Sequence, residues 1–142
     1  MSTTPETPSI MNIELELDIA ATPQAVFDGY VEEMINGPGG NTPMKMELWP
    51  GGRWFRDFGN NTGHLWAHVQ SIKPPHLIEF CGPLFMSAPV ANNIIVRIEE
   101  TASGAKMKFR HQCLGVIPDE MREGMTKGWG EMLAKAKATA EG

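Results

Sequence analysis

Of the four histidines in the chain, His111 has the surroundings that best suit a functional role. It shares the parity of Met107 and Phe109 in a predicted strand, and alternate residues of a strand face the same side. A polar ring on an apolar face can orient a ligand, or act as a general base whose pKa is set by burial. A hydrogen-bonded structural histidine is the other interpretation, which we favour slightly over ligand binding and clearly over catalysis. We therefore predict no catalytic residue.

His64 and His68 form the second candidate group, because residues four apart on one strand point to the same face. Together with His111 they could suggest a metal site. The spacing provides no further ligand, however, and the chain contains neither an HExxH motif nor a Cys/His array. Trp66 has the same parity, and this face of the strand could simply be exposed. We predict no metal site.

The other motifs exclude several classes of enzyme. Cys81 and Cys113 lie far apart and form no CxxC pattern, which favours reduced core cysteines over a disulfide. No GxxxxGK[ST] pattern accompanies Gly51 and Gly52, so these glycines do not indicate a phosphate loop. The chain also lacks a GxSxG motif and a dinucleotide-binding fingerprint. We predict no cofactor.

Arg53, Arg56 and Asp57 follow the two glycines on another predicted strand. One parity of this strand must face inward, so either Arg56 or the pair Arg53 and Asp57 approaches the interior. An inward arginine could bind a ligand carboxylate through two hydrogen bonds. An outward arginine beside acidic residues is the commoner arrangement, and the sequence leaves both open.

These residues are positioned by elements that alternation and turn residues mark out. Ile13–Ile19 alternates apolar and acidic residues, which is typical of a strand with one buried face. Thr22-Pro23 begins a helix that Gly37-Pro38-Gly39-Gly40 ends. Short turns then connect only strands, which must pair antiparallel. The predicted strands are Lys45–Trp49, Arg53–Phe58, His64–Lys73, His76–Cys81, Asn92–Glu100 and Lys106–Cys113.

A long helix that begins at Pro118 closes the chain. Its apolar stripe consists of Met121, Met125, Trp129, Met132, Leu133 and Ala136. Gly124 and Gly128 lie at the edge of this stripe, and each glycine costs a helix about 1 kcal/mol relative to alanine. Their absent side chains either leave room for a ligand, or have a structural role in close packing on the sheet or in a gentle bend of the helix. We hold the functional and the structural interpretation equal.

The order of elements predicts an α+β fold in which a curved antiparallel sheet wraps around a long C-terminal helix. We expect a disordered leader over residues 1–9 and one domain over residues 10–142. The net charge of −5 argues against a nucleic-acid partner. No apolar run is long enough to span a membrane, and no signal peptide is visible, so we expect no membrane partner and a cytoplasmic location.

The chain resembles the activator-of-heat-shock-protein-90-ATPase-homologue-like proteins, within the START-like, birch-pollen-allergen-like (SRPBCC) superfamily. The similarity runs from Ile13 to Ala138. The matching marks are Thr22-Pro23 with Val26-Phe27, Gly51-Gly52-Arg53-Trp54-Phe55, Gly63 followed by Val69–Pro75, Lys108–Gly115, and Gly128-Trp129. Relatives often carry a Trp-Trp-Gly-Pro segment where this chain has Ile35-Asn36-Gly37-Pro38.

The resemblance implies a helix-grip (START-like) fold with a hydrophobic cavity, but no single activity. Our first hypothesis is that the protein binds a small, mostly hydrophobic molecule between the sheet and the C-terminal helix. The first alternative is an enzyme, such as a cyclase, dehydratase or hydrolase, that acts on a polyketide-like or aromatic compound in the same cavity. A chaperone-associated interaction module is the third hypothesis, and a homodimer is possible. The predicted ligand-binding residues are Trp54, Arg56, Trp66, Phe80, Phe109, His111, Met125, Gly128 and Trp129.

Overall fold

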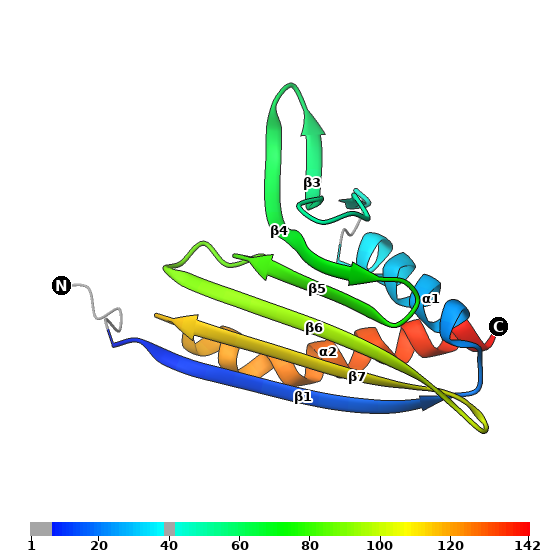
Figure 1. The fold of residues 1–142 in the computed structure, drawn as a ribbon. Coiled ribbons are helices and arrows are strands. Elements are labelled where there is room, and N and C mark those ends of the chain that lie inside the picture. Colours follow the sequence, from blue (N-terminus) through cyan, green and yellow to red (C-terminus); the bar gives the residue numbers. More distant parts are fainter. Residues whose placement is uncertain (1–6, 39–41) are drawn as a thin grey trace.

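The computed structural model describes residues 7–38 and 42–142 of the chain (Figure 1). These residues form one antiparallel sheet and two helices. The elements are β1 (Ser9–Ile19), α1 (Pro23–Asn36), β2 (Lys45–Met46), β3 (Arg53–Gly59), β4 (Thr62–Lys73), β5 (Leu77–Gly82), β6 (Val90–Thr101), β7 (Gly104–Gly115) and α2 (Asp119–Glu141).

The sheet has seven strands in the order β1-β7-β6-β5-β4-β3-β2. Each strand pairs antiparallel with its neighbours, and the last strand along the chain inserts beside the first. Helix α2 runs along one face of the sheet, while β3 and the start of β4 extend beyond the other strands as an arm (Figure 1). The predicted α+β helix-grip fold is therefore confirmed.

Local chemistry explains the bounds of α1. The Thr22 hydroxyl accepts a hydrogen bond of 3.2 Å from the Ala25 amide, and Pro23 occupies the first turn. The buried face carries Val26, Phe27, Gly29, Tyr30, Val31 and Met34. Gly29 faces α2, where a Cβ atom would come within 3.0 Å of the Ala136 carbonyl oxygen. The two helices therefore approach closely at this glycine.

Helix α2 has the orientation that its apolar stripe predicts. Trp129 is only 4% exposed, whereas Glu123, Lys127 and Glu131 are exposed. The Arg122 guanidinium donates hydrogen bonds to the Ser9 hydroxyl and the Ile10 carbonyl of β1. One flank of α2 is thereby held against the edge strand of the sheet.

Two strand predictions need correction. The strand predicted over Lys45–Trp49 is limited to Lys45–Met46. Beyond Met46 the chain turns, because the Glu47 carboxylate accepts hydrogen bonds from the amide and the side chain of Arg53. The Trp49 carbonyl then accepts a bond of 2.8 Å from the Gly52 amide, which closes the turn into β3.

The second correction concerns the parity of β4. Trp54 pairs with Ala67, but Phe55 pairs with Leu65, so a bulge at Trp66 interrupts the register. Trp66 and Ala67 are consequently both buried, and His68 is exposed. The expectation that His64, Trp66 and His68 share one face is therefore wrong for His68, which follows the bulge. The His64 and Trp66 rings remain neighbours, with 6.4 Å between their centroids.

The predicted leader falls mostly on residues 1–6, which lie outside the described residues. Strand β1 already begins at Ser9, the last residue of that predicted segment.

Candidate ligand-binding site

The concave side of the sheet carries one chain of buried hydrogen bonds, which starts from α2. The Trp129 indole Nε1–H donates to His111 Nδ1 over 3.0 Å. Because an indole nitrogen only donates, His111 Nδ1 must be the unprotonated nitrogen of the ring. His111 Nε2–H then donates to Asn92 Oδ1 over 2.7 Å, and Asn92 Nδ2 donates to the Gly82 carbonyl oxygen over 3.1 Å. Both nitrogens of His111 are thus engaged by the protein.

Burial determines the protonation state of His111. Its side chain is 0% exposed, and this desolvation lowers its pKa from 6.5 to about 4. The ring is therefore neutral at pH 7 and has no free hydrogen-bonding nitrogen. The arrangement supports the structural interpretation of His111, and it gives Trp129 a fixed position against the sheet.

Apolar contacts extend this arrangement along the inner surface of α2. The rings of Phe109 and Trp129 lie 4.7 Å apart between their centroids. Met125, one turn before Trp129, is 7% exposed. The structure therefore brings Phe109, His111, Met125 and Trp129 together, as their parity and helical spacing predict.

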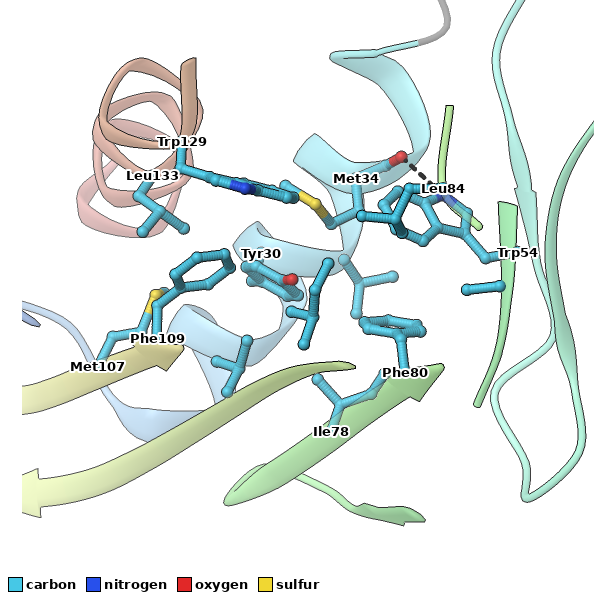
Figure 2. Close-up of a cluster of buried hydrophobic side chains, with 14 of the residues drawn as sticks. Tyr30, Met34, Trp54, Ile78, Phe80, Leu84, Met107, Phe109, Trp129 and Leu133 are labelled. Carbon is cyan, nitrogen blue, oxygen red and sulfur yellow. Dashed lines mark hydrogen bonds between the residues drawn. The ribbon is translucent and has the colours of Figure 1, made fainter. Parts of the chain in front are cut away.

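A second aromatic group lies at the base of the arm. The Trp54 ring is 5.2 Å from both the Trp66 ring and the Phe80 ring, between centroids. The Trp54 indole N–H also donates to the Met34 carbonyl oxygen of α1 over 3.1 Å, as Figure 2 shows. Trp54 and Phe80 are both 0% exposed. Three further predicted residues, Trp54, Trp66 and Phe80, thus meet in one place.

The two aromatic groups belong to one buried cluster. Figure 2 shows Trp129 and Phe109 towards one end of it and Trp54 and Phe80 towards the other. Tyr30 and Met34 project from α1 into the space between these two ends (Figure 2). The whole cluster is apolar apart from the tryptophan nitrogens and the Tyr30 hydroxyl.

Arg56 lies at the outer margin of the second group. Its guanidinium carbon is 5.8 Å from the centre of the Trp66 ring, and Nη2 donates to the Pro38 carbonyl oxygen. Arg53 points elsewhere and forms a bidentate pair with the Glu47 carboxylate. Hence Arg56, and not Arg53, lies on the same side as the tryptophans. It also borders a surface depression of ≈ 450 Å³ on the arm.

The glycines of α2 are open rather than tightly packed. A Cβ atom built on Gly124 or Gly128 would meet no atom within 4 Å. Close packing on the sheet, one form of the structural interpretation of these glycines, is therefore wrong. Gly124 lies about 200° around the helix from Arg122, which contacts β1. The side of α2 that carries Gly124 and Gly128, here called the glycine flank, thus faces away from β1. Gly128 is half-buried and precedes the buried Trp129.

Sequence reasoning missed two residues of this region. Asn92 is 4% exposed and holds His111. It shares the parity of Ile94, Val96 and Ile98 in its strand, and this alternation is the signal that could have placed it on the buried face. Tyr30 lies on the buried face of α1 and has no role among the sequence-based predictions. Its hydroxyl is buried and has no hydrogen-bond partner in the described part of the chain. The available indication was a hydroxyl in an otherwise apolar helical stripe.

The described residues hold neither a cluster of metal-ligating side chains nor a membrane-spanning helix. Within residues 7–38 and 42–142, no three His, Cys, Asp or Glu side chains gather where they could hold a metal ion. Neither described helix is both long enough and apolar enough to cross a membrane.

Several solved structures share the fold of this chain at low sequence identity. An uncharacterised Rhizobium leguminosarum protein matches with a TM-score of 0.73 at 18% identity, over 95% of this chain and 97% of that one. A Staphylococcus aureus protein of unknown function matches with a TM-score of 0.70 at 15% identity, over 94% and 95%. The di-domain ARO/CYC StfQ from the steffimycin biosynthetic pathway matches with a TM-score of 0.65 at 16% identity, over 93% of this chain and 51% of that one.

Sequence comparison identifies a family as well as a fold. No curated protein sequence matches the chain. Residues 20–141, however, match the sequence family described as Activator of Hsp90 ATPase homolog 1-like protein. This match covers α1, the sheet from β2 to β7, and α2. The chain therefore belongs to the Activator of Hsp90 ATPase homolog 1-like family.

Proposed function

We propose that this protein binds a small, mostly hydrophobic molecule between α2 and the concave face of the sheet. The observation that carries the proposal is the composition of that interior. Among the described residues, Asn92 and His111 are the only polar or charged residues that are buried as a whole, besides Tyr30 and the buried tryptophans. Their hydrogen bonds are directed to each other, to Trp129 and to Gly82. An interior of this kind favours apolar ligands.

Catalysis in the same place is less well supported. A general acid or base needs an ionisable group whose proton-carrying atom can reach the substrate. His111 is the only buried histidine among the described residues, and both of its ring nitrogens are engaged. The similarity to an ARO/CYC protein is one of fold. We therefore favour binding over turnover.

The glycine flank of α2 is the proposed position of the ligand. Gly128 is half-buried, and the space that a side chain would occupy there is free. Met121 and Met125 border the same flank, and unbranched methionine side chains adapt to variable apolar shapes. A ligand placed here would contact Trp129 and extend towards Trp54.

Two leucine substitutions on α2 test this placement. Gly128→Leu fills the half-buried space, whereas Gly130→Leu adds the same side chain at an exposed position that is equally free of neighbours. Loss of roughly 60 Å² of apolar contact costs about 1.4 kcal/mol, which is tenfold in affinity. We expect Gly128→Leu to weaken binding of an environment-sensitive naphthalene probe by about that factor or more.

Gly130→Leu is the matched control and should bind the probe as the unmodified protein does. Circular dichroism should show that both variants remain folded, because neither leucine meets a neighbouring atom at its Cβ position. Equal probe affinities of the two variants would mean that the ligand does not occupy the glycine flank.

A further inference from the structure

Tyr30 places a hydroxyl group inside the apolar cluster without a partner. Its side chain is 0% exposed and projects from α1 into the cluster that Figure 2 shows. Among the described residues, its hydroxyl oxygen has no hydrogen-bond partner. A buried polar group of this kind is rare and costly, and phenylalanine would fill nearly the same space without that cost. The hydroxyl therefore requires a partner that the protein itself does not supply.

The chemistry of this hydroxyl restricts its partner. Burial raises the pKa of Tyr30 far above its usual value of 10.0, so the phenol remains protonated and its O–H is a donor. Among the described residues, the other buried polar residues are Asn92 and His111, which are both neutral and already paired. No positively charged residue is among the buried residues that the structure describes, so a carboxylate at this depth would be a buried charge without a buried counter-charge, which is strongly unfavourable. An uncharged acceptor oxygen avoids that cost.

We propose that Tyr30 donates a hydrogen bond to an uncharged acceptor oxygen of the bound molecule, so the ligand class is apolar molecules with a carbonyl or similar neutral oxygen. This inference rests on the proposed function, because Tyr30 lies in the same cluster as Trp129 and Trp54. The apolar body of the ligand then lies against α2, and its oxygen points towards α1. Trp129 and His111 serve as a rigid wall of the site, since their polar atoms are satisfied.

Three probes of matched shape test the proposal. They are 2-acetylnaphthalene, which carries a ketone, 2-ethylnaphthalene, which has no oxygen, and 2-naphthoate, which is anionic. Dissociation constants are measured by competition against a fluorescent probe, for the unmodified protein and for Tyr30→Phe. One hydrogen bond corresponds to about a tenfold change in affinity. We expect Tyr30→Phe to raise the dissociation constant of the ketone about tenfold and to change that of 2-ethylnaphthalene by no more than about twofold.

Two further readouts separate recognition from a structural role. The infrared carbonyl band of the bound ketone should move to higher frequency in Tyr30→Phe, because its hydrogen bond is lost. Without any probe, the melting temperature of Tyr30→Phe should equal or exceed that of the unmodified protein, because an unpaired hydroxyl has been removed. A lower melting temperature would overturn the proposal, since it would show that the hydroxyl already has a partner, such as a buried water.

The binding outcomes are likewise decisive. Equal effects of Tyr30→Phe on the ketone and on 2-ethylnaphthalene would overturn the inference and leave the proposed function intact. Tighter binding of 2-naphthoate than of the ketone, with its loss in Arg56→Gln, would place recognition at Arg56 and would also overturn it. If the unmodified protein binds none of the three probes, the proposed function fails and the inference fails with it.

Discussion

Protonation of His111 links the stability of the fold to pH. The folded protein binds this proton more weakly than the unfolded chain, because burial lowers the pKa of His111 from 6.5 to about 4. As the pH falls through 6.5, the unfolded chain takes up the proton first and is stabilised relative to the fold. Stability from His111 is therefore fully present above pH 6.5, and it is lost progressively down to about pH 4. Protonation would also place a second N–H against the Trp129 indole N–H, which removes that hydrogen bond.

The size of this effect follows from the two pKa values. With 6.5 in the unfolded chain and about 4 in the fold, linkage predicts a loss of about 2 kcal/mol between pH 7.5 and pH 5. The perturbation is His111→Gln, which does not titrate and retains one polar group for Asn92. The free energy of unfolding is measured by urea denaturation at several pH values for both proteins. The unmodified protein should lose about 2 kcal/mol more than His111→Gln over this range.

The contribution of His111 is the difference between the two curves of unfolding free energy against pH, because all other titrating groups are common to both proteins. His68→Gln changes an exposed histidine of β4 and is the control for replacing a histidine with glutamine. This variant should lose as much unfolding free energy between pH 7.5 and pH 5 as the unmodified protein. Parallel curves for the unmodified protein and His111→Gln would refute the reasoning. They would mean that His111 is not a buried neutral ring in the folded protein.

Two other predictions follow from packing and exposure. Gly124→Ala should stabilise the protein by up to about 1 kcal/mol in thermal unfolding, because its Cβ position is free, whereas Gly29→Ala should destabilise it by crowding the Ala136 carbonyl. An unchanged Gly29→Ala protein would contradict the close approach of α1 and α2. A thiol reagent under native conditions should modify the exposed Cys81 and spare the buried Cys113, as mass spectrometry of the peptides can show. Equal labelling of the two cysteines would contradict the assigned strand faces.

The fold was predictable from the sequence because its determinants are local. Alternation places Met107, Phe109, His111 and Cys113 on one face of β7, and all four are buried. Helical spacing places Trp129 on the inner face of α2, and it is 4% exposed. Both patterns depend only on the geometry of a single strand or helix.

The polar contacts of the site were not predictable in the same way. His111 bonds to Asn92, 19 residues away, and this pairing depends on the register between β6 and β7. The bulge at Trp66 shifts the face of every residue that follows in β4, and no turn residue marks it. The lack of a partner for Tyr30 is a property of the whole packed core, so no local pattern could reveal it.

The location of bound ligand is tested most directly through the four tryptophan indoles. Trp129 and Trp54 lie in the proposed site, whereas Trp49 is 56% exposed on the turn before β3. With nitrogen-15-labelled protein, the indole N–H resonances are followed during titration with 2-acetylnaphthalene. The proposal predicts saturable shifts of the Trp129 and Trp54 resonances and an unchanged Trp49 resonance. Saturable binding that leaves Trp129 and Trp54 unshifted, or the absence of any shift at probe saturation, would contradict a site between α2 and the sheet.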